Sequence, residues 1–358
     1  MIEHLFILIP ANTPTGPVKG AFALANAVVG QCKVTLVTIK HGAGANAWLD
    51  PRVHTLCLAD CAQSLVAKTN YYRKILSEAS EYCKVSSLSL CMSADLLNLF
   101  CKGYASTCSS VRGNLFVNYR YDYGVIGIGL AFFHLFSLRW IDRVAAMNQS
   151  MGKQIKRYSG HTPFVIGNFI DEAQHRRSKL LKNDSDSFIF LFVGSLTSRK
   201  QPVLLITALK ELHMQGVTAR VEYVGAGPER QKVDEETRKL GLLDFVQCHG
   251  FLSEPEVMLA SADVLVLPSL SEGISRAALE ALYLGIPCVL RDVDGNRELL
   301  IDGVNGAVFA DDRDLPDAML RAAKISRKNK NYECLLPLDF RQHVAVLKYM
   351  QFIGIIDE

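Results

Sequence analysis

The chain has 358 residues, with a hydrophobic content of 49%, a charged content of 21% and a formal net charge of +3. These values are typical of a well-packed globular protein of two ordinary domains, each able to bury its own core. The 10 cysteines are scattered without a Cys-x-x-Cys pair, which excludes a disulfide framework and predicts reduced thiols. No leader peptide is recognisable, so we expect a cytoplasmic protein.

The charge is divided unevenly along the chain. Residues 1–170 carry 16 Lys and Arg against 8 Asp and Glu, a net charge of +8, whereas residues 171–358 carry 23 against 28, a net charge of −5. A basic first half favours an anionic acceptor or an anionic membrane surface. A scattered, solvated surface is the equally weighted alternative. Nucleic acid is not expected, because no basic cluster with interleaved aromatic residues occurs.

The first half begins with an apolar strand over residues 5–9 and a loop over residues 11–20, before a helix over residues 21–29. Gly16 and Gly20 lie in this loop, where glycine lets the backbone approach a ligand closely. The alternative is a plain strand-to-helix turn.

Residues 123–140 are nearly uncharged and rich in Phe, but they contain His134 and Arg139 and make a poor membrane span. The segment is therefore either a core helix or a helix that rests on a membrane surface. We favour the core helix, with partial exposure.

The most informative segment of the second half begins where the apolar strand of residues 264–267 ends at Pro268. A loop with Glu272 follows, and Ser275 is predicted to cap a short helix that carries Glu280. An anion is favoured at such a helix N-terminus. The carboxylate of Glu280 is suited to accept hydrogen bonds from two ribose hydroxyls. We therefore predict a ligand site at the carboxyl edge of a parallel sheet.

A longer ordered pattern surrounds this loop. Its elements are Glu272, Glu280, Gly285, Pro287, Gly295, Glu298 and Gly303, preceded by strands that end in the loops 194–200 and 225–228. The pattern resembles the family 4 retaining nucleotide-sugar glycosyltransferases of the bacterial cell-surface polysaccharide type. The resemblance implies an α/β fold with two Rossmann-like domains whose parallel sheets face each other across a cleft (GT-B), and a C-terminal helix that crosses back to the first domain.

The resemblance also implies domain bounds. Residues 1–170 and 338–358 are expected to form the acceptor-side domain, residues 171–186 a linker, and residues 187–337 the nucleotide-sugar-binding domain. The implied reaction moves a sugar from a nucleotide-diphosphate sugar, with UDP the expected nucleotide, to a hydroxyl of a glycan or lipid-linked acceptor in envelope polysaccharide or lipopolysaccharide synthesis. The alternatives are a non-catalytic nucleotide-sugar-binding partner subunit and a nucleotide-sugar epimerase.

Site residues follow from the same resemblance. The expected catalytic residues are Glu272, Lys200 and Arg199. The expected donor-binding residues are Gly16, Gly20, Gly194, Gly225, Phe251, Gly273, Ile274, Ser275, Arg276, Glu280 and Glu298, and Arg112 is assigned to the acceptor side. No cofactor or metal is expected, so the acidic pairs at Asp184 and Asp186 and at Asp292 and Asp294 are not read as metal ligands. The protein is also expected to attach peripherally to the inner face of the cytoplasmic membrane.

Overall fold

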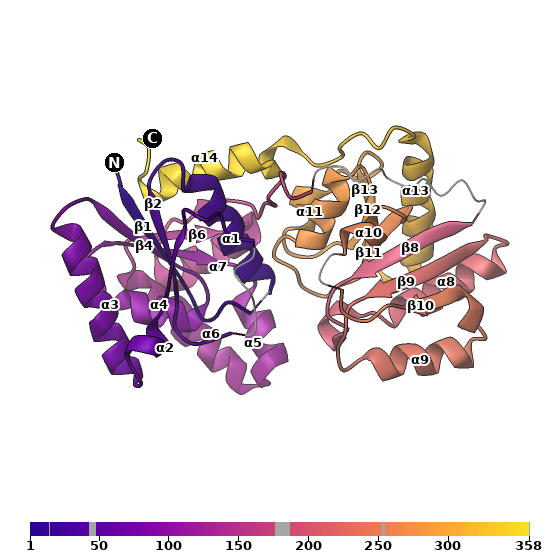
Figure 1. Cartoon of the computed structure of the whole chain (residues 1–358). Helices are drawn as coiled ribbons and strands as arrows, with labels where there is room; N and C mark the ends of the chain where they lie inside the picture. Colours follow the sequence, from indigo (N-terminus) through magenta and orange to yellow (C-terminus); the bar gives the residue numbers. More distant parts are fainter. Residues whose placement is uncertain (14, 43–47, 176–186, 253–254, 358) are drawn as a thin grey trace. The chain divides into compact units, whose positions relative to one another are not determined.

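The computed structural model describes residues 1–13, 15–42, 48–175, 187–252 and 255–357 (Figure 1). The chain divides into two compact units. Unit 1 comprises Met1–Asp171 and Asp339–Glu358, and unit 2 comprises Glu172–Leu338. Of the predicted linker, residues 176–186 lie outside the described residues.

Unit 1 is built on a parallel sheet with the strand order β3-β2-β1-β4-β5-β6-β7 among the described residues. The strands are β1 His4–Ile9, β2 Lys33–Thr38, β3 His54–Cys57, β4 Val85–Ser89, β5 Ser106–Val111, β6 Arg143–Ala146 and β7 Phe164–Val165. Every residue of β1 is buried, as expected of a central strand that helices cover on both faces. The strand order reverses between β1 and β4, so the loops after these strands diverge there.

Helices cover both faces of this sheet (Figure 1). They are α1 Gly16–Val28, α2 Leu58–Cys61, α3 Leu65–Ser80, α4 Met92–Leu99, α5 Leu115–Tyr123, α6 Ile126–Ser137, α7 Gln149–Ser159 and α14 Gln342–Ile353. Helix α1 begins five residues earlier than the predicted residue 21, which corrects the extent of the predicted loop. Pro17 lies in its first turn, where its fixed φ and missing N–H favour helix initiation.

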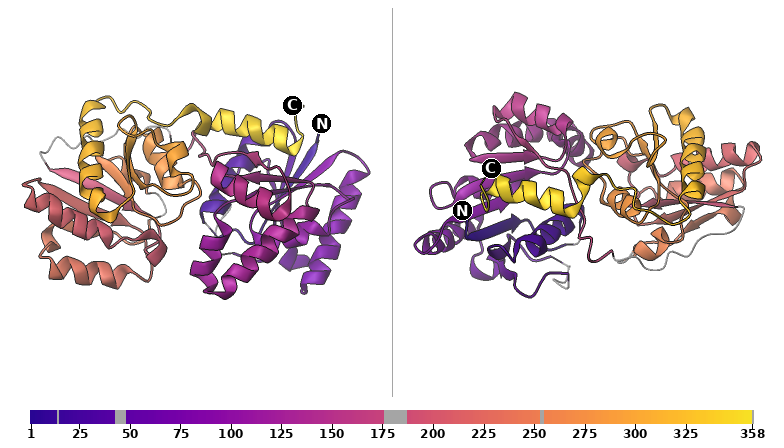
Figure 2. Two further views of the ribbon diagram at one scale, coloured as in Figure 1. Left: turned by 180° about the vertical axis from the view of Figure 1, so that it is seen from behind. Right: turned by 90° about the horizontal axis from the view of Figure 1, so that it is seen from above.

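The C-terminal helix α14 belongs to unit 1. Ala345, Tyr349 and Phe352 are fully buried in the same core cluster as residues of β1 and α1. The Tyr349 hydroxyl lies 3.0 Å from Ser110 Oγ on β5, and the amide of Ile2 donates to the carbonyl of Gly354 at 2.8 Å. The two chain ends therefore lie side by side (Figure 2).

Helix α6 has one face in the core and one face in solvent. Ala131, Leu135 and His134 are buried, whereas Phe132, Phe133 and Phe136 are 45–54% exposed. The helix is therefore a core helix with partial exposure, in agreement with the preferred prediction. Within the described residues, none of the helices is both long enough and apolar enough to span a bilayer.

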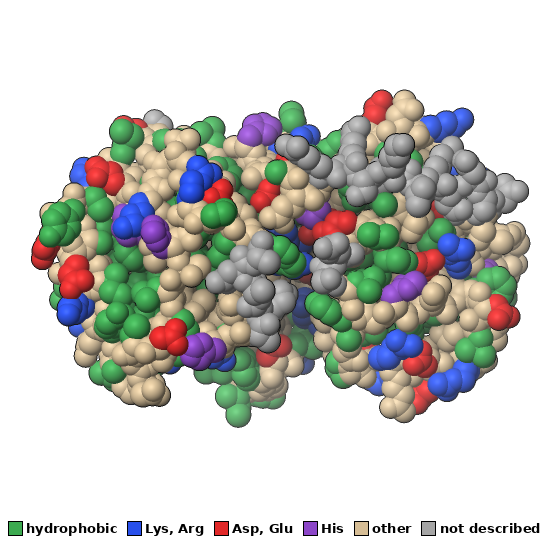
Figure 3. Space-filling view, in the orientation of Figure 1, with side chains coloured by type: hydrophobic (Ala, Val, Ile, Leu, Met, Phe, Trp, Pro, Cys, Tyr) green, Lys and Arg blue, Asp and Glu red, His purple; other side chains and the backbone are tan. Residues whose placement is uncertain are grey.

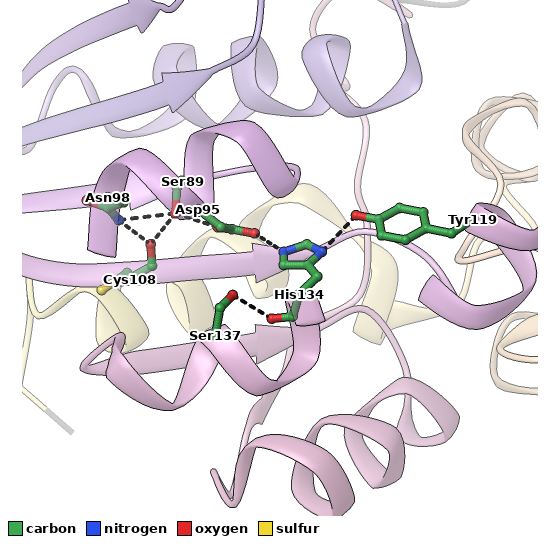
Figure 4. Close-up of polar contacts among 7 residues, drawn as sticks. All are labelled: Ser89, Asp95, Asn98, Cys108, Tyr119, His134 and Ser137. Carbon is green, nitrogen blue, oxygen red and sulfur yellow. Dashed lines mark hydrogen bonds and ion pairs between the residues drawn. The ribbon is translucent and has the colours of Figure 1, made fainter. Parts of the chain in front are cut away.

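The buried face of α6 carries a chain of polar contacts (Figure 4). His134 Nε2 donates to the Asp95 carboxylate of α4 at 2.8 Å, because a carboxylate can only accept. His134 Nδ1 then accepts from the Tyr119 hydroxyl of α5 at 2.7 Å. Burial and the nearby Asp95 carboxylate raise the pKa of Tyr119, so this hydroxyl remains a donor. Ser89 Oγ, at the end of β4, donates to the other Asp95 oxygen at 2.6 Å. The chain thus ties α4, α5 and α6 to the sheet.

We expect the His134→Ala substitution to lower the free energy of unfolding of unit 1 by about 2–4 kcal/mol, because it leaves Asp95 Oδ2 buried without its donor. Tyr119→Phe removes only the outer hydrogen bond and is expected to cost about 1 kcal/mol. Urea denaturation followed by tryptophan fluorescence measures both values, since Trp48 and Trp140 lie in unit 1. Equal, small losses for the two variants would contradict the structural role of His134.

Unit 2 is built on a second parallel sheet, with the order β10-β9-β8-β11-β12-β13 among its described strands. The strands are β8 Phe188–Val193, β9 Ala219–Val224, β10 Val246–Cys248, β11 Val264–Leu267, β12 Cys288–Arg291 and β13 Gly306–Phe309. The helices are α8 Leu204–Met214, α9 Arg230–Lys239, α10 Glu256–Leu259, α11 Arg276–Tyr283, α12 Asn296–Leu299 and α13 Leu315–Lys328. The strand order reverses between β8 and β11, which pair directly. The loops after these two strands therefore start from adjacent positions at the carboxyl edge.

Candidate functional site

The centre of the candidate site is a buried ion pair between the loops after β8 and β11. Lys200 ends a short 3-10 turn after β8, and its Nζ donates to Glu272 Oε1 at 2.8 Å. Ser269 Oγ donates to the same oxygen at 2.9 Å. The side chains of Lys200 and Glu272 are only 13% and 11% exposed. The structure thus brings together two of the three predicted catalytic residues.

The third predicted catalytic residue, Arg199, binds the backbone of the same loop. Its Nη1 donates to the carbonyl of Ser271, and its own carbonyl accepts from the amide of Leu270 at 2.8 Å. These contacts join the two loops into one surface. They also place two cationic residues beside Glu272.

A third loop supports this surface through Asp294, which the sequence analysis considered only as a discounted metal ligand. Asp294 Oδ2 accepts from the hydroxyl of Ser271 at 2.5 Å and from the amide of Glu272 at 3.1 Å. Asp294 itself has a positive φ of 44°, a conformation that Asp tolerates better than most residues. Its role depends on contacts between loops that are distant in sequence, so no local pattern predicts it.

The electrostatics of Glu272 follow from these neighbours. Burial raises the pKa of the Glu272 carboxyl, but the Lys200 and Arg199 cations and the hydrogen bonds from Lys200 and Ser269 outweigh burial. The net result is a pKa below the ordinary value of 4.5. Glu272 is therefore ionised at neutral pH and can accept hydrogen bonds but not donate a proton.

Two predicted glycines let the loops after β8 and β9 approach each other. Gly225 has φ +141°, and a Cβ at this position would lie 1.9 Å from the carbonyl oxygen of Gly194. A Cβ at Gly194 would lie 3.2 Å from Lys200 Nζ. Glycine is required here both for the backbone conformation and for the close approach. These two glycines therefore hold the backbone against the Lys200 side chain.

Helix α11 begins as predicted. Ser275 is its N-cap, and the Ser275 hydroxyl accepts from the amide of Ala278. Glu280 is only 5% exposed, one turn further along the helix, and its Oε1 accepts from Arg276 Nη2 at 3.5 Å. His175 Nε2 lies 3.8 Å from the same carboxylate oxygen. His175 was not predicted, because it precedes α11 by about a hundred residues and carries no motif of its own.

Four further predicted donor residues, Gly273, Ile274, Phe251 and Glu298, belong to unit 2. Ile274 is buried and Gly273 half-buried in the loop before α11. Phe251 is exposed after β10, and Glu298 is exposed on α12. Their assignment to donor binding stays a prediction.

The predicted residues of unit 1 form a separate group. Arg112 follows β5, and its guanidinium donates to Asn168 Oδ1 at 3.0 Å and to the Tyr349 hydroxyl at 3.3 Å. A Cβ on Gly20 would lie 2.6 Å from Arg112 Nη1, so Gly20 makes room for this side chain. A Cβ on Gly16 would have no atom within 4 Å. Both glycines lie in α1 rather than in a loop, and their role toward a donor stays a prediction.

The described residues among the discounted metal ligands have other partners, and so does His249, a residue after β10 with an imidazole that could act as a base. The Asp292 carboxylate accepts from Arg297, and His249 Nε2 lies 3.1 Å from Glu222 Oε2. Asp184 and Asp186 lie outside the described residues. His175, Glu256 and Glu280 have ligand atoms within 4.8 Å of one another, but the imidazole contacts the two carboxylates through different ring nitrogens. The metal-free expectation remains untested.

This arrangement can bind an anion and a polyol. Lys200, Arg199 and the N-terminus of α11 offer positive charge and N–H donors of the kind that bind phosphate. The ionised Glu272 and the buried Glu280 offer acceptors for hydroxyl groups. The carboxyl edge at a switch point is where open α/β sheets bind ligands.

Comparison with known proteins gives a family match for unit 2. Residues 173–333, nearly all of unit 2, match the family model described as Glycosyl transferases group 1. The match confirms the predicted resemblance to glycosyltransferases.

Two curated relatives have named roles. One is a putative colanic acid biosynthesis glycosyltransferase of Salmonella typhimurium, 33% identical over 142 residues that cover 37% of this chain and 34% of the relative. The other is an Escherichia coli galactosyltransferase named for UDP-Gal and GlcNAc-diphosphoundecaprenol, 29% identical over 133 residues that cover 36% of this chain and 34% of the relative. The matches thus span about a third of the length of each relative.

Solved structures resemble the whole chain. The Anabaena protein HepE, crystallised in complex with UDP and glucose, has a TM-score of 0.78 at 17% identity, over 99% of this chain and all of the other. This likeness concerns the fold alone. Together with the two parallel sheets and the docking of α14 on unit 1, it confirms the predicted α/β fold class with two Rossmann-like units.

The lowered pKa of Glu272 predicts a pH-dependent contribution to stability. A carboxyl whose pKa is lowered by folding stabilises the fold fully at pH values above its pKa in the unfolded chain, near 4.5. This contribution is lost as the pH falls through the pKa of the carboxyl in the folded protein. We expect Glu272→Gln to lower the free energy of unfolding by about 3 kcal/mol at pH 7, because Lys200 loses its buried partner. At pH 3 the difference from the wild type should shrink.

Urea denaturation followed by circular dichroism at both pH values measures this difference. Glu235→Gln on α9 is the matched control, since Glu235 is exposed and, among the described residues, accepts a side-chain hydrogen bond only from Gln231 one turn away. If Glu272→Gln lowers the free energy of unfolding by the same amount at pH 3 and pH 7, the ion pair does not titrate as described.

Proposed function

We propose that the chain is a retaining glycosyltransferase that moves a sugar from a nucleotide-diphosphate sugar to a hydroxyl of a glycan or lipid-linked acceptor. UDP is the proposed nucleotide, and synthesis of bacterial envelope polysaccharide or lipopolysaccharide is the proposed pathway. The nucleotide sugar is a substrate, and no metal is proposed to take part.

The observation that carries the proposal is the buried Lys200–Glu272 pair beside Arg199 at the switch point of unit 2. Two consecutive cationic residues on the loop after β8 suit a diphosphate better than a neutral ligand. Transfer builds negative charge on the leaving diphosphate as the bond to the sugar breaks. Lys200, Arg199 and the amides at the start of α11 would stabilise that charge, which is electrostatic rather than proton-transfer catalysis.

The hydroxyl groups of the donor have two candidate acceptors. Glu272 is proposed to accept from the sugar, because it is ionised and lies beside the cations that hold the diphosphate. Glu280 is proposed to hold the ribose. The named relatives support a UDP-sugar donor and a polyprenyl-diphosphate-linked acceptor, since one of them carries both in its name.

The test is turnover with purified protein. UDP-galactose, UDP-glucose and UDP-N-acetylglucosamine are each incubated with a GlcNAc-diphosphate-polyprenol acceptor in the presence of a chelator, and UDP release is measured. We expect release with one donor, and a product whose new linkage keeps the donor's anomeric configuration by NMR. Lys200→Met should lower kcat/KM by about 10²- to 10³-fold, because it removes a charge that acts on the transition state.

Lys239→Met on α9 is the control for loss of a lysine, since Lys239 is exposed and, within the part of the chain that the structure describes, forms an ion pair only with Glu236. Each alternative has its own signature. Nucleotide binding without turnover for any acceptor would favour the partner subunit, and a changed donor sugar without an acceptor would favour the epimerase. A product with the inverted anomeric configuration would contradict the proposed retention of configuration but not the proposed glycosyl transfer.

We further infer that unit 1 attaches to an anionic membrane surface through the exposed face of α6. Phe133 and Phe136 are 54% and 45% exposed, and Trp140 follows at 51%. Arg139 lies 4.8 Å from the centre of the Phe136 ring, so a cation flanks the aromatic face. Hydrophobic side chains are also visible at the surface around α5 and α6 (Figure 3). Apolar side chains with flanking cations suit the interface of an anionic bilayer.

Vesicle co-sedimentation tests this attachment. We expect binding to vesicles of phosphatidylcholine with phosphatidylglycerol, weaker binding at high salt, and at least about tenfold weaker binding of Phe133→Ser/Phe136→Ser. Phe100→Ser is the matched control, because Phe100 is 64% exposed in the same unit but lies at the end of α4. An equal loss of vesicle binding in both variants would contradict a specific role of α6. Equal binding of the wild type to neutral and to anionic vesicles would contradict attachment to an anionic surface.

A further inference from the structure

A cysteine, a histidine and an aspartate lie close together on the surface of unit 1, at the carboxyl ends of β2 and β3. Strands β2 and β3 pair in parallel, with Thr38 opposite Cys57 at their carboxyl ends. His41 follows β2 by three residues, so it lies at the same edge of the sheet as Cys57. Asp60 follows Cys57 by three residues within α2, which places both on one side of that turn.

The contacts among these three side chains form an ordered chain. Cys57 Sγ lies 3.6 Å from His41 Nδ1, within hydrogen-bond reach for sulfur. His41 Nε2 lies 3.3 Å from Asp60 Oδ1. The carboxylate can only accept, so Asp60 keeps the proton on Nε2 and leaves Nδ1 free to accept from the thiol. A nucleophile, a base and a group that orients the base are thus arranged in series.

The same three residues could instead suggest a metal site, because their ligand atoms lie within 4.8 Å of one another. A metal ion, however, binds one ring nitrogen, and its other ligands must lie around the same ion, in front of that nitrogen. Here the thiol and the carboxylate face opposite nitrogens of the imidazole. The geometry suits proton transfer from the thiol better than shared coordination.

Access to this cluster is open. The side chains of His41 and Asp60 are 69% and 62% exposed, and Cys57 is half-buried. Figure 3 shows a histidine and an acidic side chain next to each other on the surface near α2. A small reagent can therefore reach the sulfur without unfolding of the unit.

We propose that Cys57, His41 and Asp60 form a reactive-thiol site that is oxidised by hydroperoxides. As His41 takes the thiol proton, the sulfur attacks one oxygen of the hydroperoxide and the O–O bond breaks. The sulfur becomes a sulfenic acid, and the departing alkoxide or hydroxide receives the proton from His41 as an alcohol or water. The sulfur is oxidised by two electrons and the hydroperoxide is reduced by two.

Cys61 provides an internal standard in the same molecule. It is exposed, whereas Cys57 is half-buried, so access alone predicts that Cys61 reacts faster. Cys61 contacts Tyr71, and among the described side chains no imidazole lies within hydrogen-bond distance of it. A faster reaction of Cys57 would therefore reflect its neighbours rather than its exposure.

The experiment measures per-cysteine rates by mass spectrometry at pH 7, with a chelator present to exclude metal binding. Iodoacetamide reports nucleophilicity, and hydrogen peroxide followed by dimedone reports sulfenic acid. We expect Cys57 to react about tenfold or more faster than Cys61 with both reagents. His41→Gln should reduce the Cys57 rate to that of Cys61 or below, and Asp60→Asn should reduce it partly.

The Cys61 rate must stay unchanged in both variants, which shows that the surrounding fold is intact. Cys57 reacting no faster than Cys61, or a Cys57 rate unaffected by His41→Gln, would overturn the proposal. Fast alkylation that depends on His41 but yields no sulfenic acid would overturn the hydroperoxide as the reactant.

Discussion

The buried contact between Lys200 and Glu272 is the interaction on which the candidate site depends. Each side chain is nearly enclosed, so removal of Glu272 would leave the Lys200 ammonium without its carboxylate partner, at a cost of about 3–5 kcal/mol. The pair joins loops that are separated by seventy residues of sequence but start from adjacent strands. It therefore fixes the loop geometry and at the same time supplies the charges that would act on a diphosphate.

The other features of the site follow from this contact. Gly194 and Gly225 allow the backbone to pack beside the Lys200 side chain, and Asp294 holds the amide of Glu272 from a third loop. Because these groups are already in place, binding of a ligand would cost little reorganisation. Helix α11 then starts directly after the loop and places Glu280 on its first turns.

Sequence reasoning succeeded where the signal is local. Strands β8 and β11 are continuous apolar runs, and the Ser275 cap follows from residue type and position. It failed where the signal comes from distant contacts. The start of α1 at Gly16, the support of Glu272 by Asp294 and the approach of His175 to Glu280 all depend on packing that no short window contains. The sequence predicted partial exposure of α6, but it did not indicate which Phe side chains face solvent, because Phe is as apolar in solvent as in a core.

Calorimetric titration of UDP into the protein in the presence of a chelator tests whether the Lys200–Glu272 pair lies at the nucleotide site. We expect the wild type to bind UDP and Lys200→Met to bind UDP at least about tenfold more weakly, since a charged hydrogen bond to phosphate is worth about 1.5–3 kcal/mol. UDP affinity that is the same in the wild type and in Lys200→Met would contradict this placement, because the nucleotide diphosphate would then lie elsewhere than beside the Lys200–Glu272 pair.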